Sequence, residues 1–391
     1  MKHIRALKLR DRDFGDEWQK VVEDRWDYAD FLKDDRWRKD WISFDSVCHD
    51  PATDTVFCGI TSFDADIFWG WDRRQQRWVD PGYARVRDPF DAKFHRSLLR
   101  DSRDGCLYAA PALLHDLDRF NDAPGAAIVK YNPATGEIAK LGIPAPHLYI
   151  QSIVLDEARD TIYAQTYTPE FLVSFDLRTR TGRVLGPIGS GLALAQGENL
   201  VLDDRGRIWG AWQVVRAWQS KPSADGFRLF RYDPERDRID YLDKGLPHPD
   251  GAYGYAKPEG FFNLGAGPLY VSGGQGALYR VDPDTGNATF LFQAIGDEGR
   301  GRRSRLTSLQ LGPDGAAYGV TGRDGECEVL RFDPRDESYR LLGPLRDSQT
   351  GVAAWQIHDV TVTSDGVLYA GENDHPRRSS YLWEVRLTMV P

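Results

Sequence analysis

Two histidines of the sequence, His95 and His115, have the residue type and spacing for proton transfer. They lie twenty residues apart, on either side of two apolar segments joined by Arg103-Asp104-Gly105. An Asp-Gly turn between such segments predicts a β-hairpin, whose two ends lie side by side. Because imidazoles titrate near neutral pH, one ring could remove a proton and the other deliver one. The alternative is that each histidine only hydrogen-bonds the backbone of its loop.

The hairpin that separates these histidines is one of seven in the chain, each with an aromatic residue in its second strand. The aromatic residues are Phe57, Tyr108, Tyr163, Trp209, Tyr270, Tyr318 and Tyr369. They follow one another at intervals of 46 to 61 residues, and a third strand follows each hairpin. Repeats of this length without helices are typical of four-stranded propeller blades. The sequence therefore predicts an all-β fold, a seven-bladed β-propeller in which residues 1–391 form a single domain.

The last repeat ends after its third strand, which would leave one sheet edge exposed. Residues 3–10 alternate apolar and basic side chains, as a strand does. We expect this segment to become the missing outer strand of the last blade and to close the ring. Residues 16–38, with Trp18, Val22 and Trp26 on one stripe, predict a short N-terminal helical segment.

Charge and composition exclude several classes of partner. The net charge is −9 and no block of Lys and Arg occurs, so we expect neither nucleic acid nor a membrane as partner. No apolar run approaches a membrane span, and the N-terminal MKHIRALKLRDRD lacks a secretory signal, so a cytoplasmic location is expected. The four cysteines are too few for a disulfide scaffold and predict buried thiols. A disulfide or a zinc site at Cys48, Cys58 and His49 is the alternative.

In a propeller, the residues before each innermost strand and after each second strand line the mouth of the central channel. The sequence places a set rich in His, Tyr and Arg there, which suits a ligand that carries a carboxylate. Besides His95 and His115, the candidate ligand-binding residues are Tyr149, Gln151, Tyr167, Trp212, Gln213, Arg216, Lys257, Arg303, Arg305, His358 and Asn373. Asp45 and Gln356 fall at the same mouth without an assigned role, as do Glu198, Glu259 and Glu372. Carboxylate pairs among the glutamates keep glycoside hydrolysis open.

Four stretches of the chain resemble the seven-bladed propeller polysaccharide lyases, the ulvan lyases and relatives that cleave rhamnosyl-glucuronate linkages. The stretches are KFHRSL, DGCLYAA, DAPGAAIVKYNP and ENDHPRRSSYLWEV. The resemblance implies β-elimination, with histidine and tyrosine as base and acid and arginine to neutralise the uronate. It assigns His95 and His115 to proton transfer, with Tyr149 as the first tyrosine candidate and Tyr167 as the second.

The arginine of that family is expected at the end of the third hairpin, where this chain has Gln165, Thr166 and Tyr167. Arg216 is therefore the first candidate to neutralise the substrate, followed by Arg303, Arg305 and Lys257. The leading hypothesis is a lyase that acts on a short uronic-acid-containing oligosaccharide and leaves a 4,5-unsaturated uronate. A glycoside hydrolase on the same scaffold and a non-catalytic sugar- or protein-binding propeller are the alternatives. No cofactor is expected to be required, and a structural metal ion stays open.

Overall fold

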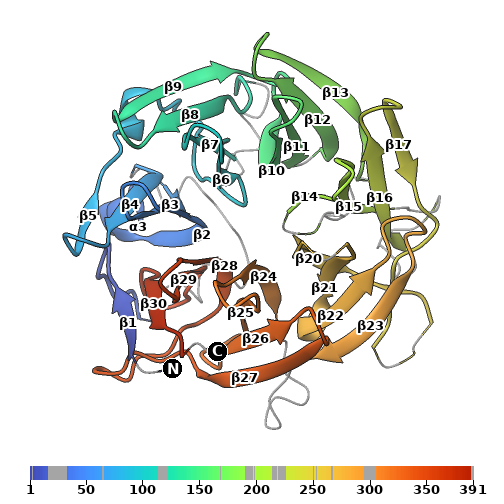
Figure 1. The fold of residues 1–391 in the computed structure, drawn as a ribbon. Helices are drawn as coiled ribbons and strands as arrows, with labels where there is room; N and C mark the ends of the chain where they lie inside the picture. The colour runs from blue at the N-terminus through green and yellow to red at the C-terminus, as the bar shows by residue number, and fades with distance from the viewer. Residues whose placement is uncertain are drawn as a thin grey trace.

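Seven four-stranded antiparallel sheets stand in a ring around a common axis in the computed structural model (Figure 1). The structure describes residues 1, 3–15, 33–63, 66–112, 122–167, 169–189, 197, 199–213, 218, 226–249, 251, 253–265, 267–294 and 305–388. The ring of seven sheets confirms the predicted seven-bladed propeller. Among the described residues, no helix combines the length and the apolar composition needed to cross a membrane.

Each of the first four blades runs outward from the axis in sequence order. Blade 1 consists of β2 (Ile42–Asp50), β3 (Thr55–Ser62), β4 (Phe68–Asp72) and β5 (Arg77–Val79). Blade 2 consists of β6 (Leu98–Arg100), β7 (Leu107–Ala109), β8 (Ile128–Asn132) and β9 (Glu137–Gly142). Blade 3 consists of β10 (Tyr149–Asp156), β11 (Thr161–Tyr167), β12 (Phe171–Asp176) and β13 (Thr181–Pro187). Blade 4 consists of β14 (Val201–Leu202), β15 (Ile208–Gln213), β16 (Phe227–Asp233) and β17 (Arg238–Tyr241).

A two-stranded ribbon, β18 (Leu246–Pro247) with β19 (Tyr255–Ala256), connects blade 4 to blade 5. Blade 5 consists of β20 (Pro258–Asn263), β21 (Leu269–Gly273), β22 (Ala277–Val281) and β23 (Ala288–Gln293). Blade 6 consists of β24 (Leu306–Leu311), β25 (Ala317–Thr321), β26 (Glu328–Asp333) and β27 (Ser338–Pro344). Blade 7 consists of β28 (Ile357–Val362), β29 (Val367–Glu372), β30 (Leu382–Arg386) and the N-terminal β1 (His3–Leu7).

The N-terminal strand closes the ring as predicted. β1 pairs antiparallel with β30 in the register His3–Arg386 to Leu7–Leu382, so the two ends of the chain share one sheet (Figure 1). Ile4 and Leu7 are buried against the neighbouring cores. The predicted helical segment lies partly outside the described residues, which contain one helix at its C-terminal end, α3 (Asp35–Asp40).

The core forms where neighbouring blades face each other, and the seven repeated aromatic residues supply much of it. All seven are buried. Phe57 of blade 1, for example, packs edge-on against Tyr131 of blade 2, with ring centroids 5.4 Å apart.

The four cysteines form no disulfide, and three of them are buried, which agrees with the prediction of buried free thiols.

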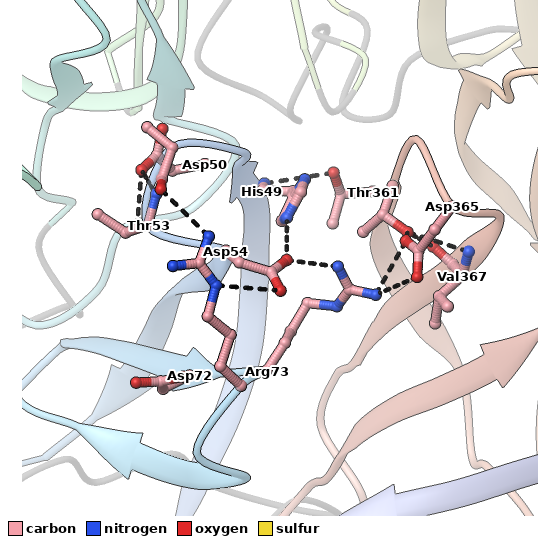
Figure 2. Close-up of polar contacts among 12 residues, drawn as sticks. His49, Asp50, Thr53, Asp54, Asp72, Arg73, Thr361, Asp365 and Val367 are labelled. Atoms are coloured by element: carbon pink, nitrogen blue, oxygen red, sulfur yellow. Dashed lines mark hydrogen bonds and ion pairs between the residues drawn. The ribbon is translucent and has the colours of Figure 1, made fainter.

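A second connection between the last and first blades lies at the far ends of their inner strands. Figure 2 shows Arg73 of blade 1 between Asp54 of its own blade and Asp365 of blade 7, to which it donates at 2.7 Å. His49 joins this network through a contact of 3.1 Å between its Nε2 and Asp54 Oδ1. The ion pairs therefore tie blade 7 to blade 1 on the face opposite to the start of the inner strands.

Candidate functional site

Several inner strands carry a β-bulge close to the point where they begin. The pairing register shifts around Asp45 in β2, around Gln151 in β10 and around His358 in β28. A bulged residue has no partner in the ladder, so its side chain can take a new direction, and bulges recur next to functional sites for this reason. In blade 2, His95 lies just before β6 in an irregular segment. These four side chains meet at the hub of the propeller.

His95 and His358 form a pair of imidazoles at this hub. Their ring centroids are 4.4 Å apart and the rings cross at 68°. His95 Nδ1 lies 3.1 Å from the Gln151 carbonyl oxygen, and His358 Nδ1 lies 2.7 Å from the Asp45 carbonyl oxygen. A carbonyl oxygen only accepts hydrogen bonds, so both Nδ1 atoms carry the hydrogen and each neutral ring has its lone pair on Nε2. The pair is thus fixed in one tautomer.

Asp45 places a carboxylate beside the imidazoles. It is 1% exposed, and its oxygens accept hydrogen bonds from the Thr61 hydroxyl and, at 3.0 Å, from the Asn373 amide. The Asn373 amide is held in turn by Gln356 at 2.9 Å. Burial raises the pKa of Asp45 from 3.8 to about 6, although the positive charge of Lys93 works in the opposite direction. At neutral pH the carboxylate therefore carries a buried charge that a cation would stabilise.

Asp45, His95 and His358 have the composition of a metal site. They offer ligand atoms that all lie within 4.8 Å of one another, and all three residues are buried. Two imidazole nitrogens and one carboxylate are donors that divalent transition metals accept, and the Nδ1 contacts to backbone carbonyls are the usual support of ligating histidines. The residues present therefore fit a divalent cation.

A lysine and a tyrosine stand beside this cluster at the mouth. Lys93 Nζ lies 5.6 Å from the centre of the Tyr167 ring, and both residues are half-buried. The charge of Lys93 also acts on Asp45. Arg305 is on the same face, where its Nε lies 3.8 Å from Glu259 Oε2. Positive charge is thus available next to a buried carboxylate–imidazole cluster.

The structure brings together part of the predicted site. His95 is hydrogen-bonded to Gln151, whose Nε2 also lies 3.3 Å from His95 Nε2. His358 and Asn373 are hydrogen-bonded to Asp45, and the contact between the two imidazoles joins the two groups. Tyr167 is at the edge of this cluster. His115, Arg216 and Arg303 lie outside the described residues, so the proposed His95–His115 pair and the proposed arginine stay predictions.

Other predicted residues have surroundings of a different kind. Tyr149 is 1% exposed within an apolar cluster between blades 2 and 3, and burial raises its pKa. The Trp212 indole donates to the Leu242 carbonyl at 3.1 Å and its ring packs on Tyr241, at the outer part of blade 4. Lys257 is exposed, and Gln213 is buried at the end of β15. The geometry therefore favours Tyr167 over Tyr149 as the tyrosine near the hub.

The sequence alone does not predict a functional role for three residues at the hub: Asp45, Gln356 and Lys93. The sequence places Asp45 and Gln356 at the mouth but assigns them no chemistry, and it gives no indication of Lys93. A signal exists for Asp45, because it has the same place in its repeat, near the start of the inner strand, as His95 and His358. Aligning the repeats on this position would have suggested the cluster.

Beyond the cluster, farther along the inner strands, the channel holds a cavity of about 400 Å³. Its lining includes His49, Arg100 and Thr361, from the later parts of those strands, and also Arg96 and Asp359. Asp45, His95, Gln151 and His358 do not line it. The cluster and the cavity therefore follow one another along the axis of the propeller.

Comparison with known proteins gives the fold but no family. No family model and no curated protein matches the chain. Among solved structures, an oligogalacturonate lyase in complex with manganese is similar with a TM-score of 0.58 at 10% identity, over 89% of this chain and 90% of that one. The RRP9 WD40 repeats are similar with a TM-score of 0.58 at 10% identity, over 90% of this chain and 96% of that one.

A third similar structure is the extracellular domain of a putative one-component system of B. thetaiotaomicron, with a TM-score of 0.58 at 11% identity. The similarity extends over 90% of this chain and 39% of that extracellular domain. Likeness at these identities establishes the propeller architecture alone, because one superfold carries many unrelated functions.

Proposed function

We propose that this propeller is a carbon–oxygen lyase that cleaves a uronic-acid-containing oligosaccharide, such as a rhamnosyl-glucuronate, by β-elimination. The observation that carries the proposal is the buried cluster of Asp45, His95 and His358 at the hub, next to Lys93 and Tyr167. A site built from imidazoles, a carboxylate and a cation suits proton removal beside a substrate carboxylate better than it suits attack by a nucleophilic side chain.

The main requirement of the reaction is stabilisation of the negative charge that develops on the substrate carboxylate, more than a strong base. A base takes the proton at C5 of the uronate, the C–H electrons form the C4–C5 double bond, and the C4–O4 bond breaks. The departing O4 receives a proton, and no water is consumed. The C5 proton is weakly acidic while the adjacent carboxylate keeps its full charge, so positive charge must face that carboxylate as the transition state forms.

The chain's own cations can meet part of this requirement. Lys93 is close enough to Tyr167 and Asp45 to act on both, and Arg305 is on the same face. A divalent cation held by Asp45, His95 and His358 would add Lewis-acid stabilisation of the substrate carboxylate. In that arrangement His95 is a ligand, and the proton-transfer roles pass to Tyr167 and to His115. The Gln151 carbonyl would orient His95 by accepting from its Nδ1, and Asn373 would orient Asp45 by donating to its carboxylate.

One structural neighbour supports the same class of chemistry. The manganese complex of oligogalacturonate lyase is a propeller of similar length that acts on a uronate oligomer, as its name states. At 10% identity this likeness adds a reaction class to examine and no residue assignment.

The test is a product screen over rhamnosyl-glucuronate and oligogalacturonate oligomers, with and without added Mn²⁺. We expect an ultraviolet-absorbing unsaturated product whose mass equals that of the substrate minus the leaving sugar, without an added water. His358→Gln and His95→Gln should abolish it. His147→Asn is the matched control, because the His147 ring also contacts a backbone carbonyl, that of Ala123 at 2.9 Å, but outside the hub cluster.

Two outcomes would overturn the proposal. Products heavier by one water and without ultraviolet absorbance would identify a hydrolase. Sugar binding without turnover, unchanged in the His95 and His358 variants, would identify a non-catalytic binding propeller.

A further inference from the structure

Arg96, the residue after His95, spans the hub of the propeller. Its Nη1 donates to the carbonyl oxygen of Thr307 in blade 6 at 2.9 Å and to that of His358 in blade 7 at 2.8 Å. Its Nη2 lies 3.4 Å from Asp359 Oδ1, and its side chain is 8% exposed. One side chain from blade 2 therefore connects to two blades that are not its neighbours in the ring.

The backbone of Arg96 serves the other imidazole. Its N–H donates to the Gln151 carbonyl at 3.0 Å, the same oxygen that contacts His95 Nδ1 at 3.1 Å. The main chain of Arg96 thus helps to fix the acceptor of the His95 ring, while its guanidinium fixes the peptide that carries His358. The two rings come from blades 2 and 7, which blade 1 separates, so such a connection keeps them together across it.

Arg96 also lies between the cluster and the cavity. The cavity is lined by Arg96 and Asp359 but by none of the four hub residues Asp45, His95, Gln151 and His358. The Arg96 guanidinium, bound to two carbonyls and a carboxylate, therefore lies at the level between the cluster and the cavity.

We propose that Arg96 is the positioning residue that holds the imidazoles of His95 and His358 side by side and closes the channel beneath them, so that ligands reach the pair from one face only. The inference rests on the proposed function for the use of the pair, but its geometry does not depend on the reaction. A planar guanidinium offers several N–H groups in a fixed fork, whereas a lysine ammonium cannot bond two carbonyls and a carboxylate in the same plane.

The experiment measures access to the two rings. Diethyl pyrocarbonate is added to wild type, Arg96→Ala and Arg96→Lys, and the carbethoxylation rates of His95 and His358 are read by peptide mass spectrometry. Arg100→Ala is the matched control, because Arg100 lines the same cavity from the same blade but pairs with Asp50 at 2.9 Å, away from the imidazoles.

We expect Arg96→Ala to raise the modification rate of both rings at least tenfold, and Arg100→Ala to leave it within twofold of wild type. Guanidinium ion at millimolar concentration should bring Arg96→Ala back toward the wild-type rate by occupying the vacated space. Arg96→Lys, which keeps the charge, carries the test if the alanine variant does not fold, and at least a threefold increase is expected. Equal rates in the Arg96 and Arg100 variants would overturn the proposal. The carbethoxylation rates are measured without any sugar. A wild-type protein that is inactive in the product screen would therefore contradict the lyase proposal alone.

Discussion

Replacing Asp45 by asparagine should make the cation-free protein more stable at neutral pH while it destroys the site. The pKa of Asp45 is raised by burial from 3.8 to about 6, so the folded state favours the protonated carboxyl. The resulting stabilisation is fully present below pH 3.8 and is lost as the pH rises through 6. At about 1.4 kcal/mol for each pH unit between these two values, the loss is about 3 kcal/mol.

Asparagine does not titrate, so the free energy of unfolding of Asp45→Asn should rise relative to that of wild type between pH 4 and pH 8 by ~3 kcal/mol. The side chain is isosteric, it can still accept from Asn373, and its amide can donate to the Thr61 hydroxyl, so the packing is kept. Urea unfolding at pH 4, 5, 6, 7 and 8 in the presence of a chelator measures the difference.

Asp50 in the same strand provides the opposite control. Burial opposes ionisation there too, but hydrogen bonds from Thr53 and Arg100 outweigh it and lower the pKa of Asp50. Asp50→Asn should therefore be less stable than wild type, with a loss that develops as the pH rises from the lowered folded-state pKa to 3.8 and that stays constant from pH 5 to 8. A difference between Asp45→Asn and wild type that is constant with pH, or that falls with pH, would refute the reasoning about the buried charge.

Three further perturbations follow from the structure. At a cation concentration that does not saturate the site, the rate of product formation should fall as the pH drops through 6, because protonated Asp45 no longer binds a cation; a rate that stays unchanged from pH 5 to 8 would contradict this. Deleting residues 1–10 should lower the melting temperature by many degrees, since it removes β1 and the buried Ile4 and Leu7; an unchanged melt by calorimetry would argue against closure by this strand. Arg73→Met should lower the free energy of unfolding in urea by about 2 kcal/mol, because it breaks the ion pairs with Asp54 and Asp365. It should leave activity unchanged, and loss of activity in a folded variant would show that the two faces of the propeller are coupled.

Much of the architecture follows from local sequence patterns. The seven aromatic residues recur at the length of one blade because each blade must bury the same face against its neighbour, and all seven are buried. The alternating pattern of residues 3–10 predicts a strand, and the last repeat has one strand fewer than the others. Counting strands was therefore enough to predict that β1 pairs with β30 and closes the ring.

The hub could be anticipated only in part. The repeat places His95 and His358 near the starts of two inner strands, which is enough to expect them at the mouth. The repeat does not indicate that His95 and His358 are neighbours. It favours His115 as the partner of His95, because those two histidines flank one hairpin. Which inner strands carry bulges, and hence which side chains turn toward the axis, depends on how the strands pack around the ring.

By itself, the sequence determined the number of blades and the strand that closes them, and it placed His95 and His358 near the starts of inner strands, because these features depend on hydrophobic periodicity and on repeat length. Only the tertiary structure decided that Asp45, His95 and His358 share one buried cluster and that Arg96 reaches across to the carbonyl of His358, 262 residues away. The physical reason is that ring closure sets distances between blades far apart in sequence, and the pKa of Asp45 depends on the burial that this closure creates.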